Sequence, residues 1–89
     1  MRFTWDPNKD RRNKRDHGIA FQEASTVFGD SLAVTVSDPD HSVGQERFVT
    51  MGHSTSGALL VVCHTEQGDT IRIISARRAT SHERKDYET

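Results

Sequence analysis

The amino-acid sequence predicts an α+β fold, in which two N-terminal helices and one C-terminal helix accompany a four-stranded antiparallel sheet. Residues 58–80 are the richest apolar stretch, and their two β-branched runs around a turn at Gln67-Gly68 indicate a β-hairpin. Apolar side chains in residues 21–28 recur every three or four positions, as on one face of a helix. With 89 residues the chain is expected to form one domain, residues 1–89.

The N-terminal part predicts a short strand and then a polar helix. Residues 2–5 alternate polar and apolar side chains, which is enough for a short edge strand. Asp6 is a preferred N-cap, Pro7 suits the first helical position and Gly18 is a typical stop, so a helix is expected over residues 7–17. Because this helix has almost no apolar face, we expect it to be solvated or to bind charged groups.

The rest of the chain alternates β-type runs with short polar turns. Thr80 and Glu83 form a capping-box pattern, which marks the start of the last helix. Successive strands joined by short turns favour an antiparallel meander. The expected elements are a helix over 19–28, strands over 32–36, 47–53 and the two arms of the hairpin, a loop over 37–45, and a helix over 81–88.

Charge is unevenly distributed, although the formal net charge is only -1. Residues 9–15 contain five Lys or Arg and residues 71–89 contain five more, whereas residues 29–46 are acidic. Such blocks permit a basic face on a neutral protein. Cys63 is the only cysteine, which excludes an internal disulfide, and its apolar surroundings favour a small buried side chain. No stretch has transmembrane length or signal-peptide character, so we expect a cytoplasmic protein.

Strand register predicts which side chains share a face of the sheet. A four-residue turn before the hairpin would place Arg47 opposite His64, and a turn centred on Gln67-Gly68 would place Cys63 opposite Arg72. A slip of one residue would invert these assignments. Because side chains alternate, we expect Arg47, His64, Ile71, Ile73, Ser75 and Arg77 on one face, and Glu46 and Arg72 on the other.

An arginine beside a histidine can support cleavage of an RNA phosphodiester. Histidine acts as base or acid near neutral pH, and arginine offers fixed donors to the charge that develops on phosphate. Arg47, His64 and Arg77 are therefore the candidate catalytic residues, and Glu46 is a further candidate base that the expected register turns away.

Structural interpretations of the same residues stay open. His64 could be a structural hydrogen-bonding residue, and Arg47 could form a surface ion pair with Glu46. The arginines after the hairpin and the basic first helix could simply be solvated surface.

No metal or cofactor is expected. Asp38, Asp40 and His41 are close in sequence, but they lie in an acidic loop without a second cluster, so a solvated loop is favoured over a metal site. The sequence contains no Walker, Rossmann or Ser-His-Asp pattern.

Several strings of the sequence, taken together, resemble one known family. The chain opens with FTWDP at residues 3–7, Lys9, HGI at 17–19 and FQEA at 21–24, and it carries RIISARRAT at 72–80. Further matching strings lie at 30–38, 46–48, 52, 57–62, 64–65, 83–84 and 87–88. They cover essentially the whole chain and resemble the BrnT toxins of bacterial type II toxin–antitoxin systems.

This resemblance implies a RelE-like ribonuclease fold and a metal-independent endoribonuclease that restrains translation and growth. It also implies neutralisation by a BrnA-type antitoxin, in a dimer of toxin–antitoxin heterodimers that binds operator DNA through the antitoxin. Arg47, His64 and Arg77 lie in matching strings and stay the catalytic candidates. The candidates for RNA binding are Glu46, Arg72, Arg78, Tyr87 and Lys9.

An alternative function is a non-catalytic interaction module that acts as the co-repressor subunit of a DNA-binding antitoxin. The basic first helix and the neutral net charge fit this alternative as well as they fit a nuclease. Salt-sensitive binding of nucleic acid without cleavage would favour it.

Overall fold

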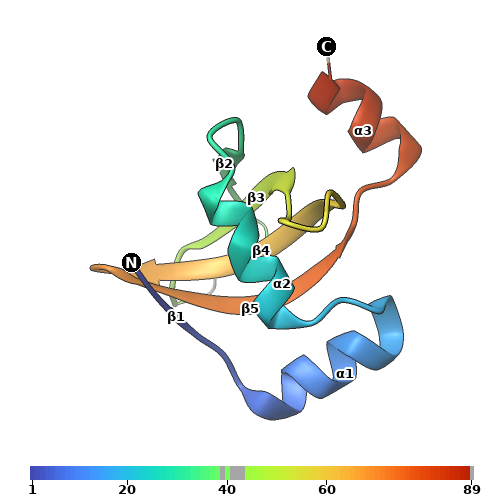
Figure 1. Ribbon diagram of the computed structural model, residues 1–89. Helices are drawn as coiled ribbons and strands as arrows, with labels where there is room; N and C mark the ends of the chain where they lie inside the picture. The colour runs from blue at the N-terminus through green and yellow to red at the C-terminus, as the bar shows by residue number, and fades with distance from the viewer. Residues whose placement is uncertain (39, 41–43, 89) are drawn as a thin grey trace.

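The computed structural model describes residues 1–38, 40 and 44–88. Its central feature is a five-stranded sheet with the strand order β1-β5-β4-β3-β2, accompanied by three α-helices (Figure 1). The expected α+β class and order of elements are confirmed. In chain order the elements are β1 (Arg2–Thr4), α1 (Pro7–His17), α2 (Phe21–Ser25), the short 3-10 helix η1 (Thr26–Gly29), β2 (Val34–Ser37), β3 (Arg47–His53), β4 (Leu59–Gln67), β5 (Thr70–Arg78) and α3 (Ser81–Glu88).

The sheet is mixed, which corrects the expectation of four antiparallel strands. The short N-terminal edge strand β1 does form, and it pairs in parallel with β5, with Phe3 opposite Ile71. The other neighbouring strands are antiparallel. Phe3 packs against the core and lies 5.4 Å, ring to ring, from Phe28. This apolar contact secures a strand of only three residues at the edge.

Helix α1 has the expected bounds and is attached to the sheet by a buried amide. The Asp6 side chain caps its N-terminus, and Gly18 ends it in the left-handed conformation at φ 72°. Asn13 is its one buried residue. The Asn13 amide donates to the carbonyls of Ile19 and Ala76, both at 2.8 Å, and its oxygen accepts the Ala76 N–H at 3.1 Å. Hydrogen bonds therefore hold α1 beside β5, in place of an apolar face.

The second helix is shorter than the expected 19–28. Ala20 is extended and has no side-chain cap, and the Asp10 carboxylate accepts the N–H of Phe21 instead, at 2.9 Å. At the other end the Thr26 hydroxyl donates to the carbonyl of Glu23 at 2.6 Å, where α2 tightens into η1. Such back-bonding competes with continuation of the α-helix.

The apolar core lies between α2–η1 and one face of the sheet (Figure 1). Side chains alternate along a strand, so the intervening residues point to the opposite face, which we call the outer face. The buried core residues are Ile19, Phe21, Ala24, Val27, Leu60, Val62, Ile71, Ile73 and Ala76. The outer face carries Arg47, Val49, Met51, Val61, Cys63, Thr65, Arg72, Ser75 and Arg77.

The expected register between β3 and β4 was wrong by one residue. Their connecting loop contains the five residues 54–58, so His53 lies opposite Leu59 and Arg47 lies opposite Thr65. Two serine hydroxyls of this loop donate to the Glu23 carboxylate of α2, at 2.8 and 2.6 Å. A contact between segments about thirty residues apart thus shapes the loop. Such a contact cannot be predicted from the residues of the turn alone.

The register between β4 and β5 also differs from the expectation. The turn lies at Gly68-Asp69, and a β-bulge in β5 leaves Ile74 without a partner between Ser75, opposite Cys63, and Ile73, opposite His64. An extra residue reverses the alternation of side chains beyond it. Ser75 and Arg77 therefore lie on the outer face with Arg47, as expected. Ile71 and Ile73 instead lie on the core face with His64, and Arg72 lies on the outer face.

Candidate functional site

Two arginines lie on either side of one β4 residue on the outer face. Arg47 of β3 and Arg72 of β5 both lie opposite Thr65. Neighbouring strands are about 4.8 Å apart, so the Cα atoms of the two arginines are separated by roughly 10 Å. Arg72 is exposed and Arg47 is half-buried. Long guanidinium side chains at this spacing can contact one phosphate from both sides.

Arg77 shares the outer face with Arg47, but its guanidinium is bound to α3. It donates to both carboxylate oxygens of Glu83, at 2.8 and 2.9 Å. This bidentate pair raises the pKa of Arg77 and lowers the pKa of Glu83 to about 2. Glu83 also accepts the N–H of Thr80 at 2.9 Å, so the expected capping box is present. Arg77 thus ties the start of α3 to β5.

His64 lies in the core, on the face opposite Arg47. Its side chain is 0 % exposed and packs between Phe28 and Phe48, with ring distances of 4.9 and 5.9 Å. Its Nε2 shares a 2.7 Å hydrogen bond with the hydroxyl of Thr50. Burial lowers the pKa of His64 to about 4, so the ring is neutral at pH 7. The expected placement of His64 beside Arg47 was therefore wrong, because the longer loop shifts the β3–β4 pairing by one residue.

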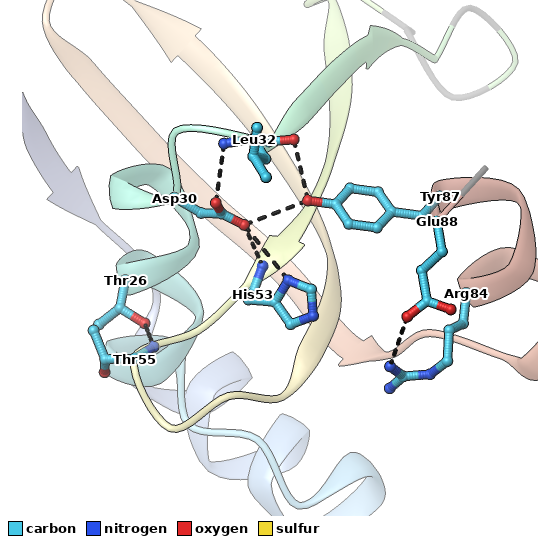
Figure 2. A network of polar contacts seen from close by, with 8 residues as sticks. All are labelled: Thr26, Asp30, Leu32, His53, Thr55, Arg84, Tyr87 and Glu88. Carbon is cyan, nitrogen blue, oxygen red and sulfur yellow. Dashed lines mark hydrogen bonds and ion pairs between the residues drawn. The ribbon is translucent and has the colours of Figure 1, made fainter.

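A second polar network joins the end of α3 to the segment before β2 (Figure 2). The Asp30 carboxylate accepts the N–H groups of His53 and Leu32, at 2.8 and 3.0 Å, and lies 3.7 Å from Nδ1 of His53. The Tyr87 hydroxyl donates to the carbonyl of Leu32 at 3.1 Å and to Asp30 at 3.4 Å. Backbone hydrogen bonds lower the pKa of Asp30, and burial raises the pKa of Tyr87.

The other residues predicted to bind RNA do not form one cluster. Glu46 is exposed and accepts the Ser37 hydroxyl at 3.1 Å. Arg78 is exposed on the side of the sheet that faces Glu23, whose pKa it helps to lower. Lys9 lines a hollow between α1 and β5, and Tyr87 lies in the network of Figure 2. Of the five residues predicted to bind RNA, only Arg72 lies opposite the same β4 residue as Arg47.

The loop for which no metal site was expected, with Asp38, Asp40 and His41, is described only in part. His41 lies outside the described residues. Within residues 1–38, 40 and 44–88, no three His, Cys, Asp or Glu side chains gather as ligands for a metal ion. In the same part of the chain, no helix is long and apolar enough to span a bilayer.

Residues 5–83 match the family described as "Ribonuclease toxin, BrnT, of type II toxin-antitoxin system". The chain belongs to the BrnT family. The fold agrees with a solved BrnT structure, since the crystal structure of the Brucella abortus ribonuclease toxin BrnT matches with a TM-score of 0.71 and 20 % sequence identity. The match covers 91 % of this chain and 99 % of that chain. No curated protein matches the chain. Membership in the BrnT family implies an antitoxin partner.

For a BrnT-family chain, the outer face offers cationic groups that could contact an RNA phosphate. The sequence pointed to Arg47 and Arg72 separately but assigned them to opposite faces. It did not point to Asp30 or Asn13, because each has a key partner, His53 or Ala76, more than twenty residues away along the chain. The Asp30-Ser31-Leu32 string has the form of an Asx turn, and this was the one local signal for Asp30.

Proposed function

We propose that this chain is a metal-independent endoribonuclease of RelE-like fold, formed by one domain over residues 1–89, that inhibits translation and growth. Membership in a family of ribonuclease toxins supports the reaction class. One observation supports the location of the proposed active site. Arg47 and Arg72 lie opposite the same residue on the outer face. Guanidinium groups supply fixed donors to a phosphate without a metal ion.

The proposed reaction is attack of an RNA 2′-hydroxyl on the adjacent phosphorus. The new O–P bond forms as the bond to the 5′-oxygen breaks, leaving a 2′,3′-cyclic phosphate and a 5′-hydroxyl. The 2′-hydroxyl proton passes to a base, and the leaving oxygen takes up a proton. Arg47 and Arg72 would stabilise the negative charge on the pentavalent phosphorane, in which three phosphate oxygens become equatorial.

The roles of the other candidates follow from their contacts. The catalytic role predicted for His64 stays a prediction, and since its side chain is buried we assign it a structural role. Arg77 could reach RNA only by giving up its ion pair with Glu83, so we assign it first to the attachment of α3. Glu46, exposed beside Arg47, is retained as the candidate base.

We further propose that a BrnA-type antitoxin neutralises the toxin in a dimer of toxin–antitoxin heterodimers. In this complex the antitoxin would bind the operator DNA. An acidic segment of the antitoxin could compete with RNA for Arg47 and Arg72, because both ligands present oxygen anions to guanidinium groups. A complex that leaves both arginines fully exposed would contradict this mode of neutralisation.

The proposed activity is tested by incubating purified protein with labelled RNA in excess EDTA. We expect cleavage to persist, with 2′,3′-cyclic phosphate ends on the products. Loss of cleavage in EDTA and its return with added Mg²⁺ would contradict metal independence. Salt-sensitive binding of RNA or operator DNA without cleavage, also in the presence of ribosomes, would favour the co-repressor module instead.

A further inference from the structure

Two hollows meet at the bulge of β5. The first, of about 210 Å³, lies on the outer face and is lined by Arg47, Asp38, Cys63, Ile74 and Ser75. The second, of about 230 Å³, lies between α1 and β5 and is lined by Lys9, Arg12, Asn13, Asp16, His17, Ile74 and Ser75. Since Ile74 and Ser75 line both hollows, the two lie next to each other at β5.

The fold leaves these hollows open for identifiable reasons. Strand β1 pairs with β5 only as far as Arg72, so the β5 edge beyond it has no further strand. Helix α1 lies along that edge instead, at a separation set by the hydrogen bonds of Asn13 to Ala76 (Figure 1). The bulge at Ile74 disrupts the ladder at the same place.

Three Lys or Arg side chains line the two hollows, Lys9, Arg12 and Arg47, against two carboxylates, Asp16 and Asp38. In the described part of the chain, Lys9 and Arg12 are exposed and form no ion pair, although Arg12 helps to lower the pKa of the nearby Asp16. Asp16, which lines the same hollow, is engaged by Arg15, whose Nε donates to it at 3.0 Å. This contact lowers the pKa of Asp16 and offsets its charge.

We propose that the two hollows form one trough that binds single-stranded RNA, with phosphates contacting Lys9 and Arg12 at one end and Arg47 at the other. This inference rests on the proposed ribonuclease function and adds α1 to its substrate site. The distance across two strand spacings and one helix radius is roughly 15 Å, which exceeds one nucleotide. A flexible single strand can follow the step from the outer face to α1, whereas the backbones of an A-form duplex follow a fixed helical path.

The test uses a fluorescent, 2′-O-methylated RNA 12-mer, which cannot undergo attack by a 2′-hydroxyl. Its dissociation constant is measured against salt for the wild type, for Lys9→Ala with Arg12→Ala, and for a control with Arg11→Ala and Lys14→Ala. Both double variants remove two positive charges from α1, but the control residues do not line the trough. Loss of two phosphate contacts should weaken binding at least about tenfold and lower the salt slope by about 1.4, since each contact contributes about 0.7 on a single strand.

The control variant should lose less than about threefold and keep the wild-type salt slope, because a distant charge is screened by salt. Asp16→Asn should have the opposite effect and tighten binding, since it removes a negative charge from the wall of the trough. Equal losses in both double variants, or unchanged binding in both, would overturn the trough while leaving RNA cleavage by the wild type intact. A wild type that neither binds the analogue at low salt nor cleaves RNA would overturn the proposed function, and the trough with it.

A second readout locates the RNA directly. Cys63 is the only cysteine and lines the outer hollow with a partly exposed side chain. The RNA analogue should slow alkylation of Cys63 by iodoacetamide in the wild type and the control, and should protect it less in the Lys9→Ala/Arg12→Ala variant at the same RNA concentration. Alkylation of Cys63 at an unchanged rate with saturating RNA would contradict the proposed path.

Discussion

Arg47 and Arg72 lie opposite the same residue, Thr65, from the two strands that flank β4. They are distant in sequence, and the register of two hairpins brings them to one face. Arg72 is exposed and Arg47 is half-buried, so the pair can reach solvent without a change of fold. This relationship is the reason why we propose the outer face as the RNA-binding site of this BrnT-family chain.

Substitution of either arginine should reduce RNA cleavage with little effect on stability. We expect Arg47→Ala and Arg72→Ala each to lower the single-turnover cleavage rate by about 10²-fold, since each removes a donor to the transition-state phosphate. Arg11→Ala, an exposed arginine of α1, is the matched control and should keep the wild-type rate. If Arg47→Ala and Arg72→Ala both cut RNA as fast as the control, the outer-face site is wrong.

The buried His64 should make stability depend on pH. Its pKa of about 4 in the folded state lies below the ordinary value of 6.5, so the unfolded state binds more protons between these values. Stability is therefore fully present above about pH 6.5 and falls as the pH drops through 4, by up to about 3 kcal/mol. The ionisable group facing the ring is Glu66, at 3.5 Å from Nδ1, and an ionised Glu66 would reduce this loss.

The measurement for His64 is urea unfolding at pH 7 and pH 4.5. His64→Gln keeps a hydrogen-bonding group near Thr50 but does not titrate, so it should lose less stability than the wild type between the two pH values. A second variant, His64→Phe, removes both the titration and the hydrogen bond and should show the same shallow pH dependence from a lower starting stability. Equal losses of stability between pH 7 and pH 4.5 in the wild type and both variants would exclude His64 as the source of the pH dependence.

The ion pair of Arg77 with Glu83 predicts that the two residues act together. Both side chains are partly exposed, so a double-mutant cycle should give a coupling of only about 0.5–1 kcal/mol. If Arg77 mainly holds α3, then Arg77→Ala and Glu83→Ala should reduce RNA cleavage to a similar, small extent. A large loss of cleavage in Arg77→Ala, with normal cleavage in Glu83→Ala, would instead support the predicted catalytic role of Arg77.

Tyr87 should act as an attachment for the end of α3. Tyr87→Phe removes the hydroxyl that donates to Leu32 and Asp30, while the ring keeps its edge contact with His53 at 5.8 Å. We expect the free energy of unfolding to fall by about 1 kcal/mol. Amide hydrogen exchange should become faster than in the wild type, and more so in α3 than in β4 or β5. Unchanged exchange in α3, together with weaker binding of RNA, would favour the predicted RNA-binding role of Tyr87.

Asn13 should be among the most sensitive positions of the chain. Asn13→Leu removes three hydrogen bonds and leaves buried backbone groups of Ile19 and Ala76 unsatisfied, so we expect a loss of about 2–4 kcal/mol. Asn8→Ala, an exposed position of the same helix, should cost less than about 0.5 kcal/mol. Chemical denaturation of both variants compares them directly, and equal stabilities would show that α1 is held to β5 by other contacts.

Local chemistry predicted the first and last helices and most strands correctly. The bounds of α1 follow from Asp6, Pro7 and Gly18, and those of α3 from its capping box, because these signals lie within a few residues of the ends they mark. The bounds of β3 also agree with the expected 47–53. The parallel pairing of β1 could not be predicted, since it depends on where the whole chain returns to β5.

The candidate site was harder to predict than the fold because it depends on register. The Glu23 contact that shapes the loop after His53 and the bulge at Ile74 are both tertiary features. One shifted pairing moved His64 away from Arg47, and one bulge brought Ser75 to the outer face. A period-2 pattern does not encode either feature, so the sequence placed Arg47 and Arg77 on one face correctly but assigned His64 and Arg72 to the wrong faces.

The central claim is tested most directly by comparing RNA cleavage in excess EDTA by Arg47→Ala/Arg72→Ala and by His64→Gln. Circular dichroism at the assay temperature first verifies that both variants are folded. We predict that the double arginine variant loses cleavage by at least about 10²-fold, whereas His64→Gln keeps a rate within about threefold of the wild type. Full cleavage by the arginine variant together with none by folded His64→Gln would contradict the outer-face site and place the reaction at the buried histidine.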